Sequence, residues 1–223
     1  MRTVEAHVEF INPPEYGVVL DTIERVGRTC YKSEDKITEF SAEGLVRGLI
    51  KRGHEAMIEH GSVTLRFIND RCVSHEEVRH RIASFGQEST RYCNYSTDKF
   101  NWEVTYIDIE RGMELDATDS KLPFEVKLAI IHEWMVACLD AERHYLRMLE
   151  LGATPQIARS VLNNSTKTEI CITMNFREWR HFIRLRNDPT AHPQMREVAQ
   201  QVLDMLYEKY PVFFEEFVKE DYP

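Results

Sequence analysis

The chain has 223 residues, 43% of them hydrophobic and 29% charged, so it is long enough for one substantial domain with a buried core. Its formal charge of −9 argues against non-specific binding to nucleic acid, which requires a basic surface to neutralise phosphates. The sequence contains no linker-like stretch and no internal repeat, and we expect a single domain over residues 1–223.

The cysteines and the N-terminus indicate a soluble, cytoplasmic protein. Five cysteines are scattered along the chain without a C-x-x-C pair, a pattern typical of reduced thiols rather than of disulfides or a zinc ribbon. The first ten residues, MRTVEAHVEF, lack the apolar core of a signal peptide. No stretch approaches the roughly 18 apolar residues of a membrane span, so we expect no membrane association.

The hydrophobic pattern in the first half of the chain predicts both strands and helices. Alternating apolar residues predict strands, and apolar residues three to four positions apart predict helices. In chain order these elements are a strand over residues 3–11, helices over 15–29 and 41–52, a strand over 62–68 and a helix over 74–85. The spacing of Ser74 and Glu77 matches a capping box, which predicts that the last helix begins at Ser74.

The second half continues this mixture after a polar stretch over residues 86–101. The predicted elements are a strand over 102–109, a surface loop over 110–121, a long helix from Pro123 to Gly152, a short helix from Thr154, a strand over 168–174, helices over 177–187 and 192–208, and an apolar tail over 212–218. Because no regular βαβ alternation is present, we predict an α+β (mixed α/β) fold with a small, mainly antiparallel sheet flanked by helices.

The segment that follows Glu77 is dense in candidate binding residues. On a helix over residues 74–85, three consecutive basic residues fan around the polar arc: Arg79, His80 and Arg81. Such an arrangement is compatible with a solvated face of weak ion pairs. The next turn offers hydrogen-bond donors suited to a phosphate: Gln87, Ser89, Thr90 and Arg91. The residues alone leave both interpretations open.

A second basic segment runs from Phe176 to Arg186. On a helical wheel, Trp179, Phe182 and Ile183 form an apolar stripe, and Arg186 projects from its middle. A charge at that position loses its water and needs an anion or strong acceptors as its partner. The partner is either a structural carboxylate or a bound ligand, unless the helix ends there and leaves Arg186 in solvent.

Other motifs point away from metals and from the common dinucleotide folds. The segment from His54 to His60 resembles a zinc-protease helix, but the second histidine of H-E-x-x-H would fall at position 58, which is Ile58. We therefore expect no metal site. The sequence contains no G-x-G-x-x-G motif and no P-loop, so any dinucleotide must be bound in another way.

Taken in order, these motifs resemble one family. Arg79-His80-Arg81, followed after seven residues by Ser89, reproduces the R-H-R-x7-S signature of the flavin-dependent thymidylate synthases. Four further blocks match in family order: Gly53 to Glu55, Gln87 to Tyr92, Ala158 to Leu162 and Asn175 to Arg186. Together the blocks cover most of residues 50–200, so the resemblance is far more specific than the signature alone.

The resemblance implies an enzyme, a methyltransferase that converts dUMP to dTMP. In this family 5,10-methylenetetrahydrofolate supplies the carbon, and NADPH reduces a bound FAD, which supplies the hydride. The resemblance also implies a homotetramer whose FAD and dUMP sites are assembled from several subunits. The expected partners are therefore dUMP, folate and further copies of the chain, with no polynucleotide and no membrane.

The resemblance assigns roles by position. The cofactor-binding residues would be His54, Ala56, Arg79, His80, Arg81, Gln87, Asn175, Arg177 and His181. The substrate-binding residues would be Glu76, Arg79, Gln87, Glu88, Ser89, Thr90, Arg91, Arg159 and Arg186. Arg186 would be the catalytic residue, because it would stabilise negative charge that develops on the pyrimidine.

Three other functions have to be distinguished from this one. A thymidylate synthase that uses folate without flavin needs an activated thiol, for which Cys93, near Arg91, is the candidate. A flavin reductase would bind flavin but not dUMP. A protein that binds polynucleotides through its arginines would show a steep dependence on salt, and the charge of −9 counts against it.

Overall fold

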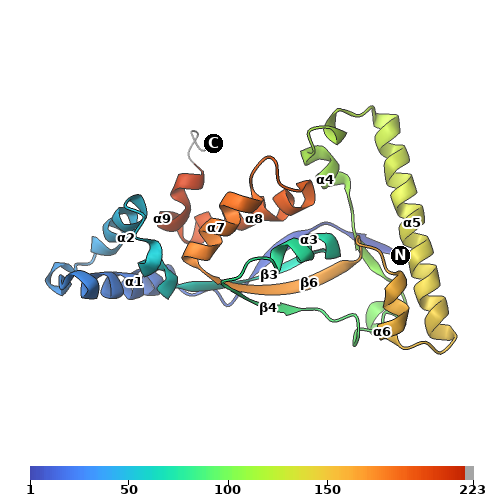
Figure 1. Ribbon diagram of the computed structural model, residues 1–223, viewed down its shortest axis with the longest axis horizontal. Coiled ribbons are helices and arrows are strands. Elements are labelled where there is room, and N and C mark those ends of the chain that lie inside the picture. Colours follow the sequence, from blue (N-terminus) through green and yellow to red (C-terminus); the bar gives the residue numbers. More distant parts are fainter. Residues whose placement is uncertain (219–223) are drawn as a thin grey trace.

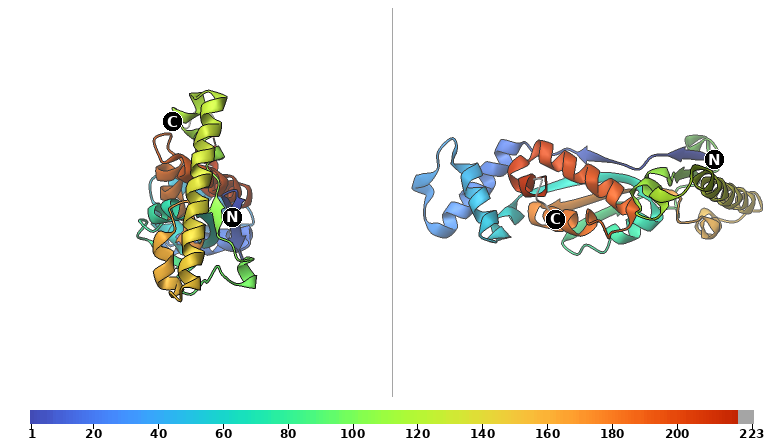
Figure 2. Two further views of the ribbon diagram at one scale, coloured as in Figure 1. Left: turned by 90° about the vertical axis from the view of Figure 1, so that its right-hand side faces the viewer. Right: turned by 90° about the horizontal axis from the view of Figure 1, so that it is seen from above.

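The computed structural model describes residues 1–218, and these form an elongated molecule (Figure 1). A small sheet lies in the middle, and the helices α1 (Tyr16–Tyr31) and α2 (Ser41–Lys51) lie beyond one of its ends. The long helix α5 (Phe124–Glu150) stands across the other end, as both views in Figure 2 show. The central sheet therefore lies between α1 and α2 at one end and α5 at the other.

Four antiparallel strands form the central sheet in the order β2-β3-β6-β4. Their bounds are His7–Ile11 for β2, Ser62–Asp70 for β3, Ala83–Gln87 for β4 and Lys167–Asn175 for β6. The alternation predicted for the two central strands is confirmed. Val63, Leu65 and Phe67 are buried along β3, and β6 buries every second residue. The mixed fold with a mainly antiparallel sheet is therefore as predicted.

The single strand predicted over residues 3–11 is wrong, because the chain changes partner within it. β1 (Arg2–Val4) pairs in parallel with β5 (Thr105–Ile107), whereas β2 pairs with β3. The predicted strand over 102–109 is correspondingly shorter than expected. Alternation alone could not reveal the change, since both parts keep an extended backbone with side chains on alternate sides.

The main hydrophobic core joins the sheet to the helices. α7 (Phe176–Arg186) and α8 (Pro193–Lys209) lie over the sheet (Figure 1). Trp179 of α7 is fully buried and donates a hydrogen bond from Nε1 to the backbone oxygen of Val63, 3.1 Å away. Because this bond joins the first turns of α7 to β3, it fixes the position of the helix over the sheet.

The apolar tail predicted over residues 212–218 completes this core. It forms α9 (Pro211–Phe214) and a 3-10 turn over Glu215–Phe217, and Phe213 and Phe214 are fully buried. Further 3-10 turns connect other elements: Glu34–Lys36, Glu55–His60, Asp98–Phe100, Asp119–Lys121 and Arg159–Val161. Within residues 1–218, no helix combines the length and the apolar character needed to cross a membrane.

The helix predicted over residues 74–85 is wrong in both its start and its end. The helix is α3 (Arg71–Glu77), and its N-cap is Asp70, whose Oδ1 accepts a hydrogen bond from the backbone nitrogen of Val73 at 2.7 Å. The capping-box interpretation of Ser74 therefore fails. The second part of the predicted helix is strand β4, because residues 83–87 pair with β6 along the sheet edge.

The surface loop predicted over residues 110–121 is also wrong. The segment forms α4 (Glu110–Leu115), in which Met113 is buried, and then a 3-10 turn. Gly112 lies so close to α8 that a Cβ there would meet Cγ of Gln194 at 2.7 Å. Six helical residues are too few for a clear periodic signal, and packing against α8 provides what the local sequence lacks.

The long helix predicted to begin at Pro123 is confirmed as α5, but the chain covers little of it. Of its 27 residues only Cys138 and Tyr145 are buried, in a second, smaller core beside α6 (Pro155–Ala158). Its exposed large apolar side chains include four that fall within about 60° on a helical wheel: Phe124, Leu128, Met135 and Leu139. A helix with so much exposed apolar surface is typical of an interface.

Candidate functional site

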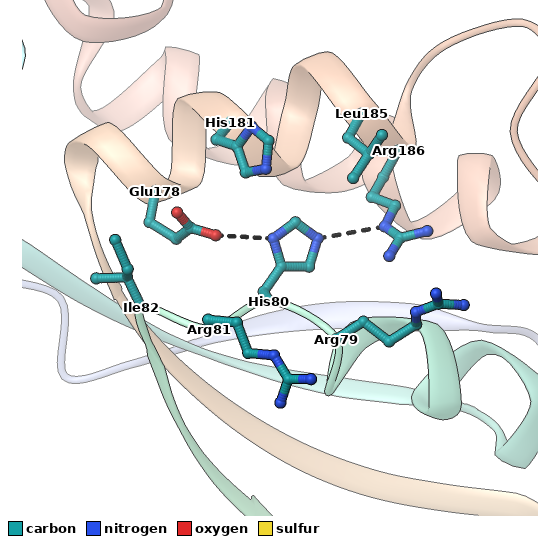
Figure 3. A pocket seen from close by; sticks show the side chains of 8 residues that line it. All are labelled: Arg79, His80, Arg81, Ile82, Glu178, His181, Leu185 and Arg186. Carbon is teal, nitrogen blue, oxygen red and sulfur yellow. Dashed lines mark hydrogen bonds and ion pairs between the residues drawn. The ribbon is translucent and has the colours of Figure 1, made fainter.

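The connection between α3 and β4 carries the three consecutive basic residues. Since α3 ends at Glu77, Arg79, His80 and Arg81 lie on a turn instead of on a helix face. The backbone nitrogen of Arg79 donates to the carbonyl of Glu76 at 3.3 Å, and that of His80 donates to Glu77 at 3.1 Å. This tight turn directs His80 inward, and Arg79 and Arg81 toward the opening of a cavity (Figure 3).

Helix α7 supplies the opposite wall. Its N-cap is Asn175, whose Oδ1 accepts a hydrogen bond from the backbone nitrogen of Glu178 at 2.8 Å. The apolar stripe predicted from the sequence is buried, which turns Glu178, His181 and Arg186 toward the turn described above (Figure 3). The helical wheel therefore predicted the orientation of α7 correctly.

Between these two elements lies a cavity of about 550 Å³. Its lining residues are Arg79, His80, Arg81, Ile82, Glu178, His181, Leu185 and Arg186 (Figure 3). A second cavity of about 370 Å³ shares three of these residues and is lined by Glu55, Glu59, Ile82, Asn175, Arg177, Glu178, His181 and Arg184. The two cavities are neighbours along α7 and share Ile82, Glu178 and His181 as lining residues, and together we call them the groove along α7.

The imidazole of His80 lies between the carboxylate of Glu178 and the guanidinium of Arg186. Its Nδ1 lies 2.8 Å from Oε1 of Glu178, and its Nε2 lies 3.2 Å from Nε of Arg186. The ring is buried against Phe182, with centroids 5.1 Å apart. Burial lowers the pKa of His80, and the positive charge of Arg186 acts in the same direction, against the attraction of Glu178. A neutral imidazole is therefore the favoured form.

Arg186 is largely buried, with 12% of its side chain exposed, and it has a structural partner. Its Nη1 donates to Oε2 of Glu76 at 2.9 Å, and its Nη2 donates to the backbone oxygen of Glu76 at 2.8 Å. Burial lowers the pKa of Arg186, an effect that the Glu76 carboxylate opposes. With the bond to His80, three of the five guanidinium N–H groups are engaged, which leaves two for a ligand.

Arg79 and Arg81 differ from Arg186 in having no partner. Neither guanidinium makes a hydrogen bond or an ion pair with any of residues 1–218, although both line the cavity. Two unpaired arginines beside a groove suit a ligand that carries phosphates, because guanidinium groups bind phosphate through two parallel hydrogen bonds. The chemistry of these residues is therefore compatible with a ligand that carries phosphates, such as a flavin dinucleotide.

The residues predicted for the dUMP phosphate lie elsewhere. Gln87 ends β4 and donates to Ser74 and Thr168, while Arg159 donates from Nη1 to Oγ1 of Thr90 at 3.0 Å. None of residues 87–91 lines the cavity around Arg186, nor does Arg159. The Arg79–Arg81 turn precedes β4 and the loop over residues 87–91 follows it. The five residues of β4 span four steps, so the strand alone separates the turn from the loop by roughly 13 Å. The structure thus brings Thr90 and Arg159 together but does not bring them to Arg186.

Glu88, Ser89 and Arg91 belong to the same loop but differ in whether other residues of the chain already bind them. Glu88 accepts a hydrogen bond from the hydroxyl of Tyr95 at 2.9 Å and lies 3.3 Å from Nζ of Lys167. Ser89 is half-buried, and its carbonyl oxygen accepts hydrogen bonds from the backbone nitrogens of Tyr92 and Cys93. Arg91 is exposed and lies over the ring of Tyr92. Glu88 is therefore engaged within the chain, whereas Arg91 is free to reach a ligand.

His54 and Ala56 lie outside both cavities, although the resemblance places them near the cofactor. His54 is exposed, and its Nδ1 lies 3.1 Å from the hydroxyl of Tyr31. The residues that do reach the groove are their neighbours Glu55 and Glu59, and Glu59 accepts from Nη1 of Arg177 at 2.6 Å. In the isolated chain Arg177 is therefore partly neutralised by an acid that the sequence did not single out.

Glu178 is the most important site residue that the sequence analysis missed. One signal could have located it. The spacing of Asn175 and Glu178 is that of an N-cap and the third helical residue, so it places Glu178 on the first turn of α7. Its partner His80 lies 98 residues earlier in the chain, and no local sequence pattern predicts a contact over that distance.

His80, Glu178 and His181 also have the donor types of a metal site, with ligand atoms within 4.8 Å of one another. Both nitrogens of His80 are already engaged, by Glu178 and by Arg186. A metal ion among these three groups would have to replace the hydrogen bond between His80 and Glu178, and the adjacent guanidinium of Arg186 is a poor neighbour for a cation. The arrangement therefore favours a hydrogen-bonded group over a metal centre.

Cys93 does not have the surroundings of an activated thiol. Burial raises its pKa, and the nearby carboxylate of Glu88 adds to this effect. A nucleophilic cysteine needs the opposite, a cationic environment that favours the thiolate. This geometry counts against the interpretation of the chain as a thymidylate synthase that uses a cysteine nucleophile.

Comparisons with known proteins identify the family to which the chain belongs. Residues 19–212 match the family described as "Thymidylate synthase complementing protein". The flavin-dependent thymidylate synthase of Corynebacterium aurimucosum is 32% identical over 202 residues, covering 87% of this chain and 78% of the relative. That of Mycobacterium tuberculosis is 31% identical over 225 residues, covering 95% and 87%.

A solved structure gives the same result at the level of the fold. A UMP/dUMP methylase from Streptomyces cacaoi, bound with 5-Br dUMP, superposes with a TM-score of 0.78 at 25% identity and covers 96% of each chain. The sequence motifs, the groove between the Arg79–Arg81 turn and α7, and these similarities all agree. The chain therefore belongs to the flavin-dependent thymidylate synthases, a family of methyltransferase enzymes that depend on a flavin.

Proposed function

We propose that this protein converts dUMP to dTMP by reductive methylation, with 5,10-methylenetetrahydrofolate as the carbon donor and FAD reduced by NADPH as the source of hydride. The observation that carries the proposal is the state of Arg186. Its guanidinium lines a cavity, is largely desolvated, and retains two N–H groups that no residue of the described chain uses. Such a group is suited to stabilise an anion that forms beside it.

The groove along α7 supports the flavin part of the proposal. Arg79 and Arg81 would bind the diphosphate, and Asn175, Arg177 and His181 would line the remainder of the cofactor. When it is bound, the flavin supplies the hydride, a step for which no protein side chain is competent. The contribution of the protein is to hold the two ring systems against each other and to exclude water between them.

Arg186 would act on the substrate electrostatically. The pyrimidine reacts as the nucleophile toward the carbon that folate supplies, so its reacting form carries negative charge on the ring oxygens, and the two unused N–H groups of Arg186 would donate to that charge. The bonds to Glu76 and His80 hold the guanidinium in one orientation before substrate arrives. Little reorganisation is then required at the moment of reaction, which is the condition for effective electrostatic stabilisation.

Residues 87–91 and Arg159 would bind dUMP, with Arg91 and Arg159 on its phosphate. These residues lie outside the cavity of Arg186 in the same chain. A complete site would therefore combine the Arg186 region of one copy with the loop of another, as in a homotetramer with shared sites. The exposed apolar stripe on α5 supports such an assembly, because a second copy would cover it.

The first test is the absorbance spectrum of the purified protein, repeated without oxygen after addition of NADPH, with and without dUMP. We expect a flavin band that NADPH bleaches and dUMP perturbs, followed by dTMP formation when methylenetetrahydrofolate is added. A protein that contains no flavin and takes up no added FAD would contradict the proposal. Flavin reduction without any dUMP binding would indicate a flavin reductase instead.

A second test addresses the shared site. Arg186→Ala and Arg91→Ala each disable a different half of the proposed site, so each variant alone should be nearly inactive at low dUMP. Co-expressed variants should form mixed oligomers in which about a quarter of the sites are intact, if each site takes its halves from different copies. Activity of the mixture that does not exceed the sum of the separate variants would contradict sharing between copies.

A further inference from the structure

Three side chains near the floor of the cavity form one hydrogen-bonded chain. Glu178, on the first turn of α7, contacts Nδ1 of His80 at 2.8 Å, and Nε2 of His80 contacts Nε of Arg186 at 3.2 Å (Figure 3). Glu178 and Arg186 come from opposite ends of the same helix, and His80 comes from the turn below it. The imidazole therefore connects the beginning of α7 to its end.

The direction of each hydrogen bond follows from the chemistry of Arg186. A guanidinium is always protonated and can only donate, so Nε2 of His80 must be the acceptor and cannot carry a proton. The single proton of a neutral imidazole is then on Nδ1, where it is donated to the carboxylate of Glu178. The contact with Arg186 can form only with this tautomer, and the contact with Glu178 is what stabilises it over the alternative.

The surroundings of His80 make this arrangement depend on Glu178. The groups that face the ring from α7 are Glu178, His181 and Arg186, and Glu178 is the only anion among them. The pKa of His80 is lowered mainly by burial and by Arg186. Without Glu178 the ring proton would have no acceptor at Nδ1, so the proton could move to Nε2, where it would face the Nε–H of Arg186.

The orientation of Arg186 depends on the same contact. Glu76 binds the two terminal nitrogens, and only His80 binds Nε. A guanidinium held at all three nitrogens cannot rotate about its long axis. If the contact at Nε becomes repulsive, the guanidinium is free to tilt on Glu76, and its two remaining N–H groups lose their direction into the cavity.

We propose that Glu178 is a positioning residue: by accepting the Nδ1 proton of His80 it fixes the tautomer that holds Arg186, and so sets the direction in which Arg186 donates to the substrate. This inference rests on the proposed role of Arg186. It concerns a residue that makes no hydrogen bond or ion pair with Arg186 and acts on it only through the imidazole.

The test compares Glu178→Gln with Glu178→Ala. The amide oxygen of glutamine can still accept from Nδ1, so Glu178→Gln should retain most of kcat. Glu178→Ala removes the acceptor and should lower kcat by about 10- to 100-fold, the range for loss of one charge-assisted hydrogen bond. The KM for dUMP should change much less than kcat in either variant, because the residues proposed to bind the dUMP phosphate lie outside the cavity that Glu178 lines.

The tautomer itself provides a readout that does not require activity. In protein labelled with ¹⁵N-histidine, the His80 signals, assigned by their loss in His80→Asn, should show a protonated Nδ1 and a bare Nε2. In Glu178→Ala the protonated nitrogen should become Nε2. This spectrum is informative even if the protein does not methylate dUMP, so failure of the proposed function and failure of this inference can be told apart.

Three outcomes would overturn the inference. The first is a wild-type spectrum with the proton on Nε2, and the second is a kcat for Glu178→Ala equal to that of the wild type. The third is an equal loss in Glu178→Gln and Glu178→Ala, which would mean that the negative charge matters and the tautomer does not. If Glu178→Ala fails to fold, the wild-type spectrum and the Gln variant still decide the matter.

Discussion

The Arg186 region and the loop over residues 87–91 differ in how far contacts within the chain fix the positions of their side chains. Arg186 is held at all three nitrogens by Glu76 and His80, and most of its surface is buried. In the loop, Arg91 is exposed and lies over the ring of Tyr92, and its guanidinium makes no hydrogen bond or ion pair with residues 1–218. One region is therefore organised before any ligand arrives, and the other has donors that are still without an acceptor.

This difference suggests how the proposed site divides its tasks. Charge stabilisation requires a fixed dipole, because a donor that must first reorient loses much of its effect. Binding of a mobile phosphate tolerates flexible donors, because the phosphate orders them on arrival. Four substitutions test this division, from the largest expected effect to the smallest.

The largest effect is expected for Arg186→Ala. Removal of the oriented guanidinium should lower the rate of dTMP formation by a factor of about 10² to 10³ or more. The flavin band should persist, because Arg79 and Arg81 remain. Arg186→Lys keeps the charge but cannot make the three contacts, and it should recover only a small part of the activity. Near-normal turnover of Arg186→Ala would remove the role we assign to this residue.

A smaller but still large effect is expected for Leu139→Lys on the apolar stripe of α5. A charge buried in an interface between copies should shift the protein to smaller species at micromolar concentration and lower activity by about tenfold or more, since the two halves of the site would separate. Light scattering after gel filtration measures the mass. Glu133→Lys, on the opposite face of the same helix, is the control and should leave the mass unchanged. Equal masses for Leu139→Lys and the wild type would contradict this use of α5.

Arg159→Ala tests the loop. Arg159 donates to Thr90 in the structure, and its loss should raise the KM for dUMP by about 10- to 100-fold, the value of a charge-assisted hydrogen bond. Reduction of the flavin by NADPH should be unaffected, because Arg159 lies outside the groove along α7. Arg25→Ala on the exposed side of α1 serves as a control for loss of a surface charge. An unchanged KM would exclude Arg159 from the phosphate site.

The smallest effect concerns a buried acid beneath the Arg186 region. Burial raises the pKa of Glu77 from 4.5 to about 8, and Asn69 donates to its Oε1 at 2.7 Å. The folded protein therefore retains a proton that the unfolded chain releases, so this group makes the protein less stable as the pH rises from about 4.5 to about 8.

Glu77→Gln removes this titration and keeps an acceptor for Asn69. Its free energy of unfolding should gain on that of the wild type as the pH rises through this window, by up to about 1.4 kcal/mol for each pH unit. Thermal melting between pH 5 and pH 8.5 measures the difference, with the exposed Glu150→Gln as a control that should follow the wild type. Parallel melting curves for Glu77→Gln and the wild type at every pH would show that Glu77 is not buried as an acid.

The sequence by itself determined the elements with long, regular patterns. β3, β6, α5 and α7 were predicted from periodicity, and α7 was predicted with the correct face inward. The R-H-R-x7-S pattern and the position of Arg186 were also visible in the sequence, because both depend on residues that lie close together along the chain. Local chemistry is sufficient for features of this kind.

Only the tertiary structure decided the features that depend on distant partners. Residues 83–85 were predicted to end a helix but belong to β4, because pairing with β6 outweighs local preference. The partner of Arg186 proved to be Glu76, and the partner of His80 proved to be Glu178, across 110 and 98 residues respectively. A buried charge pairs with the oppositely charged group that lies nearest to it in the folded state. Here the packing of α7 on the sheet brings those groups together.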